Sequence, residues 1–368
     1  MLKNFILALF IACVSANTYY VSPNPTAPYL GTESKPYRIT DLPLTYTIDD
    51  QIIFLPGSAT YSVGTKTFIN PSATITPGCK FSASLLNFQN SATVSCDSSS
   101  FLATSRLRCN SVTNVISTNC NFSKSSLWTA PATYVTVNGG YFDGLTTTQG
   151  LQVAGVQLDV EYVTFTSSST TLPPMQMVAT VDEAVMTMNN LVFNGCNTTN
   201  GNSILLMNSK NGEEVTATIN TIDFTNCYSG NAFLELRNDQ SNVVFYSGAS
   251  VATVTATGGS VKAGFISLTN MASNSDMSVT GTTLTCTGTN FNNGPGFTVS
   301  ATGSGKAVFD GQQWFNNAIC GPTNMANIVR CTGNINETKF FYAGYNEGAT
   351  TIDTCTLTSI DTSPECGV

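Results

Sequence analysis

Most of the chain alternates apolar residues with threonine, serine and other small residues in short runs. Leu151–Val156, Val215–Ile219 and Val251–Ala256 show the pattern clearly. In such runs every second side chain points to the same face, so the pattern predicts strands with one buried and one polar face. Glycine, asparagine and serine between the runs predict turns. No 3.6-residue apolar period occurs after residue 16, so we expect an all-β protein.

Two rows of apolar residues recur at a nearly constant interval. Each residue of the first row begins a short polar run, and the residues recur at steps of roughly 31. They are Phe193, Phe224, Val254, Leu284 and Phe315. The second row recurs at nearly the same step, and its members are Ile204, Phe233, Phe265, Phe297 and Ile328. Two rows with one period indicate a repeat architecture. Because the units are strand-like, we expect a solenoid in which each β coil stacks on the one before it.

The repeat also predicts how the chain is organised. At roughly 31 residues per coil, residues 17–368 would form about ten or eleven coils in a single domain. We assign residues 17–60 to an N-terminal cap and first coil. Residues 91–130 contain cysteines and show the least regular pattern, so we expect irregular coils or a side excursion there.

The opening segments resemble those of pectin-lyase-like proteins. These segments are Tyr19–Asn24, the Gly-Thr turn Gly31–Tyr37, and Asp49–Gly57, where aspartate precedes an apolar strand that ends in Pro-Gly. The later Phe-x-x-Cys and Phe-Asn-Asn runs resemble coils of polymorphic outer-membrane-type proteins and protist surface proteins. The resemblance covers most of the chain and implies a right-handed parallel β-helix. It implies no single activity, because this fold carries lyases, hydrolases, adhesins and structural proteins.

Residues 1–16 have the pattern of a signal peptide. Lys3 provides the positive start, Phe5–Val14 is an apolar core too short to cross a bilayer, and Val14–Ala16 suits a signal peptidase. We expect cleavage after Ala16 and secretion of a chain that begins at Asn17. The later sequence predicts neither a transmembrane segment nor a lipid-anchor signal.

The 12 cysteines fit an oxidising compartment, where most of those after Cys13 should pair. The repeat places Cys196 and Cys227 at the same position of neighbouring coils. Equivalent Cα atoms there lie about 4.8 Å apart, within reach of a disulfide. Proximity in sequence alone suggests four more pairs, Cys79–Cys96, Cys109–Cys120, Cys320–Cys331 and Cys355–Cys366. Cys286 is left over, either free or available for an intermolecular bond.

Three sequons predict N-linked glycans in a eukaryotic secretory pathway, at Asn121, Asn197 and Asn336. Charged residues make up 10% of the chain and the net charge is −8. Because no basic stripe is present, we expect neither nucleic acid nor an anionic membrane as a partner.

The residues of familiar catalytic sites are missing. The chain has no histidine, which excludes Ser-His and Cys-His catalysis and the commonest zinc ligand. The Gly-His-Gly and Arg-Ile-Lys segments of polygalacturonases are absent, as is the Arg-x-Pro-x-x-Arg stretch of pectate lyases. We therefore assign no catalytic residue, no metal ligand and no cofactor.

Paired carboxylates leave an alternative open. Asp159 and Glu161 lie two apart on a predicted strand and share one face, as two acids in a glycosidase or calcium site would. The pairs Asp182–Glu183 and Glu213–Glu214 would diverge if extended. We favour solvent-exposed charges for all of them, and a turn-forming role for Asp49–Asp50.

Aromatic residues allow two interpretations. The row of Phe193, Phe224 and Phe315 keeps the coil period and is interrupted by aliphatic residues, which favours stacking inside the core over a sugar-binding platform. Trp128, Tyr134 and Tyr141 are candidates for exposed sugar contacts, although single aromatic residues are common on protein surfaces without any ligand.

These observations favour a non-catalytic extracellular structural or surface glycoprotein, able to self-associate end to end into filaments or a matrix. The alternatives are a polysaccharide lyase or glycoside hydrolase with an atypical carboxylate site, and a carbohydrate-binding adhesin.

Overall fold

The computed structural model describes residues 16–340, except 44, 147–149, 181–182, 200, 210–213, 239–245, 263, 271–275, 288, 293–294, 302–305, 312–326 and 334–338. Within this part the chain is all-β, with one 27-stranded sheet and one 4-stranded sheet. The predicted signal peptide lies almost entirely outside the described residues.

The first half contains β1 (Thr18–Val21), the 3-10 helix η1 (Ile39–Asp41), β2 (Gln51–Phe54), β3 (Gly64–Ile69), β4 (Ser72–Ile75), β5 (Lys80–Ser82), β6 (Ser84–Gln89), β7 (Thr93–Asp97), β8 (Ser100–Leu102), β9 (Arg106–Thr118), β10 (Asn121–Ser123), β11 (Ser126–Asn138), β12 (Tyr141–Asp143), β13 (Leu151–Glu161), β14 (Thr164–Thr166), β15 (Ser169–Thr170) and β16 (Met175–Ala179). The second half contains β17 (Ala184–Asn189), β18 (Leu191–Asn194), β19 (Asn197–Thr198), β20 (Leu205–Ser209), β21 (Glu214–Thr225), β22 (Tyr228–Ser229), β23 (Leu234–Asn238), β24 (Tyr246–Thr257), β25 (Ser260–Val261), β26 (Ile266–Asn270), β27 (Asp276–Thr287), β28 (Pro295–Ala301), β29 (Lys306–Gly311), β30 (Asn327–Gly333) and β31 (Lys339–Phe340).

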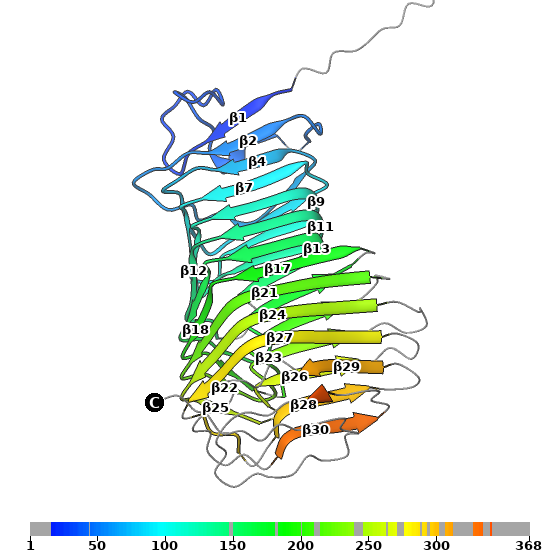
Figure 1. The fold of residues 1–368 in the computed structure, drawn as a ribbon. Helices are drawn as coiled ribbons and strands as arrows, with labels where there is room; N and C mark the ends of the chain where they lie inside the picture. Colours follow the sequence, from blue (N-terminus) through cyan, green and yellow to red (C-terminus); the bar gives the residue numbers. More distant parts are fainter. Residues whose placement is uncertain are drawn as a thin grey trace, which may run out of the picture.

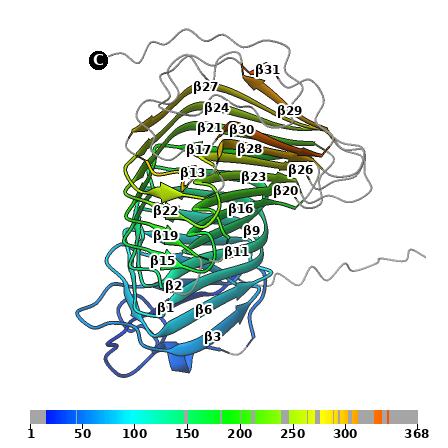
Figure 2. The same ribbon diagram turned by 90° about the horizontal axis from the view of Figure 1, so that it is seen from below.

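Strands pair in parallel with strands one coil further along the chain, which is consistent with a β-solenoid (Figures 1 and 2). A first face runs from β1 through β2, β4 and β7 to the later parts of β9, β11 and β13, and on through β17, β21, β24 and β27. A second face contains β3, β6, the earlier parts of β9, β11 and β13, and β16, β20, β23 and β26. A third face contains the short strands β5, β8, β10, β12, β14 and β18, and it continues in the later part of β21.

The coil length changes along the molecule. Parallel register aligns one phenylalanine from each of seven successive coils, namely Phe81, Phe101, Phe122, Phe142, Phe165, Phe193 and Phe224. The step between neighbours in this series grows from roughly 20 residues at its start to roughly 31 residues at its end. The predicted period near 31 therefore holds for the later coils, but not for those before Phe165. The total number of coils remains a prediction.

Residues 91–130 form regular coils, in contrast to the irregular excursion that we expected. Strands β9 and β11 stay in register from Arg106 paired with Ser126 to Thr118 paired with Asn138. The segment looked irregular because its coils are shorter than the later ones, so its apolar residues do not follow the period of the later rows.

Both predicted rows contain an offset. Phe193 aligns with Phe224, as expected, but Val254 aligns with Ile222, two residues before Phe224. In the second row Phe297 aligns with Ile266, one residue after the expected partner. A shift of two keeps a residue on the same side of the sheet and a shift of one reverses it, so sequence spacing alone did not determine the register.

Stacked aromatic rings form the centre of the core. From Tyr61 to Phe224 the successive rings on this column have centroids 4.7–5.1 Å apart and interplanar angles of 5–15°. The phenylalanines in it are buried. Interior stacking of Phe193 and Phe224 is confirmed, while Phe315 lies outside the described residues.

The N-terminal segment covers the first edge of the stack. Strand β1 pairs on one side with β2. On its other side the amides of Tyr20 and Ser22 donate to the carbonyls of Gly31 and Tyr37 at 3.0 Å each. The loop between β1 and β2 also buries Ile39 and Leu42 in the core. These contacts fit the expected cap in residues 17–60.

Candidate functional site

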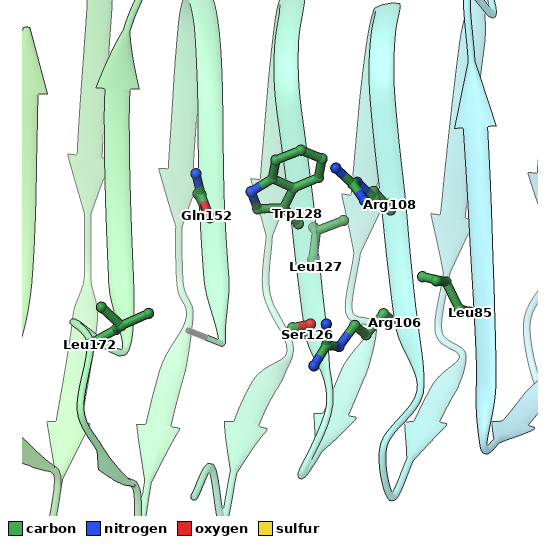
Figure 3. A pocket seen from close by; sticks show the side chains of 8 residues that line it. All are labelled: Leu85, Arg106, Arg108, Ser126, Leu127, Trp128, Gln152 and Leu172. Carbon is green, nitrogen blue, oxygen red and sulfur yellow. The ribbon is translucent and has the colours of Figure 1, made fainter. Parts of the chain in front are cut away.

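A cleft of about 250 Å³ lies on the outer side of the second face (Figure 3). Its lining residues come from five successive coils and are Leu85, Arg106, Arg108, Ser126, Leu127, Trp128, Gln152 and Leu172. A ligand in this cleft would lie across the strands, along the axis of the stack.

Strand alternation places the arginines in the cleft. Leu107 is buried in the core, so Arg106 and Arg108 on either side of it point outward from β9. Register then places Trp128 beside Arg108 and Gln152 beside Trp128. The guanidinium carbon of Arg108 lies 3.9 Å from the ring centroid of Trp128, a cation–π contact that holds the side chain in place.

The two arginines keep their hydrogen-bond donors available. No described residue forms an ion pair or a hydrogen bond with either guanidinium. By contrast, Arg237 binds the Glu235 carboxylate at 2.6 Å, and Arg38 donates to the Tyr29 hydroxyl. The cleft therefore concentrates unpaired positive charge on a chain whose net charge is −8.

A smaller hollow of about 150 Å³ adjoins the cleft and shares Arg106 and Ser126 with it. Lys124 lines this hollow and adds a third basic group. Three cations from two neighbouring coils thus face the same part of the surface, an arrangement suited to an anionic ligand.

A third, shallower hollow of about 650 Å³ lies over the third face. Its lining residues are Asn119, Asn121, Gly140, Tyr141, Asp143, Thr164 and Thr166. The Thr166 hydroxyl donates to the Asp143 carboxylate at 2.8 Å. An exposed aromatic ring beside amide, carboxylate and hydroxyl groups suits contact with a hydroxylated ligand.

Asp159 and Glu161 share the outer side of β13, as predicted. The alternate residues Leu158 and Val160 point into the core and are buried. Their aligned neighbours on the adjacent coils are Thr136 and Thr187 for Asp159, and Asn138 and Asn189 for Glu161. The Gln157 amide donates to Asp159 at 2.9 Å. Neither carboxylate lines one of the three hollows described above.

Of the other two predicted acidic pairs, Asp182–Glu183 and Glu213–Glu214, the structure describes only the side chain of Glu183. Glu183 is exposed and has φ of 55°, whereas Asp182 and the side chains of Glu213 and Glu214 lie outside the described part. Among the described residues no three acidic, cysteine or histidine side chains gather closely enough to hold a metal ion.

Asp50 has the predicted turn-forming role. Its carboxylate is 2% exposed and accepts hydrogen bonds from the Thr47 amide at 2.7 Å and the Asn17 amide at 2.9 Å. Burial alone would raise the pKa of Asp50, but these hydrogen bonds outweigh burial and lower it.

Glu235 escaped the sequence analysis. It is 3% exposed on β23, and its carboxylate accepts hydrogen bonds from Ser203 at 2.8 Å and Asn231 at 3.0 Å besides pairing with Arg237. All three partners lie on the same coil as Glu235 or on the adjacent one, so we interpret this network as stabilising the coils. The spacing of acidic residues gives no hint of such burial.

The described cysteines pair differently from two of the predictions. Cys96 is bonded to Cys120, with Cα atoms 6.5 Å apart, so the pairs Cys79–Cys96 and Cys109–Cys120 are wrong. Short coils place Cys96 opposite Ser117 of β9, near Cys120 after the next turn. Cys109 lies on the second face, aligned with Phe88, and Cys79 is a buried thiol that donates to the Phe54 carbonyl.

Cys196 and Cys227 do occupy equivalent positions of neighbouring coils, because Asn197 aligns with Tyr228. Both are buried thiols in the structure. The pKa of Cys196 is raised chiefly by two effects. The larger is the hydrogen bond between the two thiols, and the smaller is burial. The disulfide between them remains a prediction. The side chains of Cys286, Cys320, Cys331, Cys355 and Cys366 lie outside the described part.

The other candidate residues are on the surface. The sequon residues Asn121 on β10 and Asn197 on β19 are partly exposed, while Asn336 lies outside the described residues. Tyr134 is 48% and Tyr141 44% exposed, and Trp128 is partly exposed in the cleft.

No helix in the described part of the chain has the length and apolarity needed to cross a membrane. Comparison with known proteins identifies no relative, because no family model, curated protein or solved structure matches the chain.

Proposed function

We propose that the chain is a secreted, non-catalytic structural or surface glycoprotein built on a right-handed parallel β-helix. The parallel stack supports this fold, because crossovers between parallel strands are nearly always right-handed. The predicted signal peptide and sequons support secretion and glycosylation. The proposal includes self-association of the chain, end to end along the axis of the stack.

The isolation of Asp159 and Glu161 is the observation that carries the non-catalytic proposal. A glycosidase needs two carboxylates on opposite sides of a bound sugar. These two stand side by side on a strand, with threonine and asparagine as their neighbours along the stack. Nothing in this arrangement encloses a scissile bond between them.

An activity assay tests the proposal. The purified protein should not cleave pectin, pectate, alginate or chitin oligomers, with or without calcium. Turnover that disappears in Asp159→Asn or Glu161→Gln, while Glu33→Gln retains it, would contradict the proposal and favour a polysaccharide lyase or hydrolase.

The arginine cleft favours a second candidate, binding of an acidic carbohydrate without turnover. Arg106 and Arg108 offer unpaired guanidinium donors, which suit carboxylate or sulfate groups, and Trp128 and Gln152 offer contacts for a sugar ring. A cleft of 250 Å³ is smaller than typical small-molecule sites, so it suits one or two sugar units.

Fluorescence can measure this binding. The chain has two tryptophans, so Trp314→Phe leaves Trp128 as the reporter. Titration with sulfated or uronic-acid oligosaccharides should change its emission, and Arg106→Gln with Arg108→Gln should weaken binding by about tenfold or more. Lys80→Gln removes a charge on the third face and serves as the control. Equal binding by the double variant would contradict this candidate.

A further inference from the structure

The two described sequons share a geometry that the motif itself does not require. In each, the middle residue is buried, Phe122 in one and Thr198 in the other. Because strand side chains alternate, the asparagine and the third residue of each sequon lie on the outer side. Ser123 is partly exposed and Thr199 is exposed. Both asparagines therefore face outward from ordered strands.

Each sequon asparagine is aligned with a tyrosine on the next coil. Asn121 on β10 pairs in register with Tyr141 on β12, and Asn197 on β19 pairs with Tyr228 on β22. Figure 2 shows β19 and β22 next to each other in the small sheet. Tyr141 is 44% and Tyr228 is 53% exposed, so both present ring surface beside the asparagine.

The coil on the other side carries a small residue in both cases. Ser100 aligns with Asn121 and Ser169 aligns with Asn197, so each asparagine has serine before it and tyrosine after it. Aligned residues on neighbouring parallel strands lie about 4.8 Å apart. A group attached to the asparagine side chain thus has space on one side and an aromatic face on the other.

The amide groups are also available for modification. No described residue forms a hydrogen bond with the side chain of Asn121 or Asn197. Other asparagines of the stack use theirs, as Asn110 does with Asn87 at 3.2 Å and Asn231 with Glu235 at 3.0 Å. Attaching a sugar at Asn121 or Asn197 would break no such bond.

We propose that Tyr141 and Tyr228 are docking platforms for the first N-acetylglucosamine of the glycans on Asn121 and Asn197. The proposal rests on the glycoprotein function proposed above. The apolar face of the sugar packs on the ring, and at Asn121 the sugar enters the hollow over the third face, where Asp143 and Thr164 can bind its hydroxyl groups. The glycans then lie along the stack and cover the outer side of the coils.

Expression in a glycosylating eukaryotic host allows a direct test. Mass spectrometry of glycopeptides establishes occupancy at each site. Tyr141→Ala and Tyr228→Ala should each speed release of the neighbouring glycan from the folded protein by peptide-N-glycosidase roughly fivefold, which corresponds to about 1 kcal/mol of lost contact. Each should also remove an upfield shift of the N-acetyl methyl proton signal. Tyr141→Phe keeps the ring and should retain both properties.

Tyr134→Ala is the matched control, because Tyr134 is 48% exposed but aligns with Asn114 and Gln157, neither of which begins a sequon. Its release rates should equal those of the unchanged protein. Occupied sites with unchanged release rates and methyl signals in both alanine variants would overturn the tyrosine contact alone. Unoccupied Asn121 and Asn197 would overturn the glycoprotein proposal, and the contact with it.

Discussion

At the scale of single residues, one buried position shows why two cysteines are accommodated in the core. After three of the turns that leave the third face, a small polar residue is buried at the same position, three residues after the aligned phenylalanine, and these residues are Ser84, Ser125 and Ser168. Their hydroxyls donate to the carbonyl two residues earlier, at 2.9, 3.0 and 3.2 Å. Cys227 takes the equivalent place, and its thiol bonds the Thr225 carbonyl at 3.5 Å. The cysteine thus replaces a serine in a repeated hydrogen-bond pattern.

Serine substitution should therefore separate two kinds of buried cysteine. Cys227→Ser should change the free energy of unfolding by less than about 1 kcal/mol, because the site already supplies acceptors for a hydroxyl. Cys109→Ser should cost about 1–3 kcal/mol, because only burial acts on this thiol and the hydroxyl would lack a partner. Urea unfolding with a reductant present in every sample measures both. Equal losses would show that the serine position gives no special tolerance.

Asp50 provides the second prediction at this scale, because a lowered carboxyl pKa links stability to pH. The folded-state pKa lies below the unfolded value near 3.9. The stabilisation is therefore complete above the unfolded pKa and is lost as pH falls through the folded one. In a chain that begins at Asn17, the donor to Asp50 becomes a charged ammonium group, which strengthens this bond at neutral pH.

Asp50→Asn should lower the free energy of unfolding by about 1–3 kcal/mol at pH 7. The difference from the unchanged protein should shrink below pH 4 and vanish once Asp50 is protonated in the folded state. Thermal unfolding followed by circular dichroism from pH 2 to pH 7 measures this difference. A difference of the same size at all pH values would mean that the charge is not responsible.

At the scale of elements, the aromatic column shows how two faces of the stack share the core. Register places Ala256 directly after Phe224, which leaves space above the Phe224 ring. The ring of Phe233, from the segment that leads into β23, fills this space and stacks on Phe224 at 5.2 Å. The column then ends, because Phe233 meets Phe265 edge to face at 89°.

Ala256 and Phe233 should therefore be coupled. Ala256→Phe alone should overpack the core and cost about 1–3 kcal/mol. Phe233→Ala alone should cost about 3–5 kcal/mol because it leaves a cavity. The double variant should be more stable than the sum of these losses predicts, since the new ring occupies the space of the old one. Strict additivity in denaturant unfolding would contradict the shared-space explanation.

The elements also show what the sequence could and could not predict. Apolar alternation predicted the strands and the rows after Phe193 predicted parallel stacking, because both depend on local pattern. The short coils were missed, although Phe81, Phe101, Phe122 and Phe142 each stand between two residues on the outer side of a short strand. The cleft depends on the pairing of Arg108 with Trp128 in the next coil, so it could not be predicted without the short period.

At the scale of the whole molecule, the covered edge of β1 limits how chains can join. A second chain that added a strand there would have to displace Gly31 and Tyr37, whose carbonyls already accept hydrogen bonds from β1. Open filaments require two different ends that bind each other. Association that cannot use the edge of β1 lacks one of these two ends, so it gives closed pairs and no open filament.

We therefore expect monomers and dimers, and no longer assemblies, at micromolar concentrations. Light scattering coupled to size exclusion measures the mass, and negative-stain microscopy of unreduced material shows the shape. Replacing residues 30–37, which form the cover, with a shorter glycine-containing turn should expose β1 and promote longer assemblies. Filaments of the unchanged protein would contradict this prediction and restore head-to-tail stacking.

The changing coil length has a consequence for how such a chain can gain or lose residues. Among the short coils, removal of residues 123–142 would take out one whole coil and join Phe122 to Asp143, the residue that follows the next aligned phenylalanine. This deletion would also spare Cys96 and Cys120. A deletion shorter by a single residue at the same place would turn every later side chain on that strand to the opposite side. Near Phe224 a deletion that preserves the register must remove the longer coil that separates Phe224 from Phe193. Insertions and deletions in this protein are thus tolerated in units whose size depends on their position along the axis.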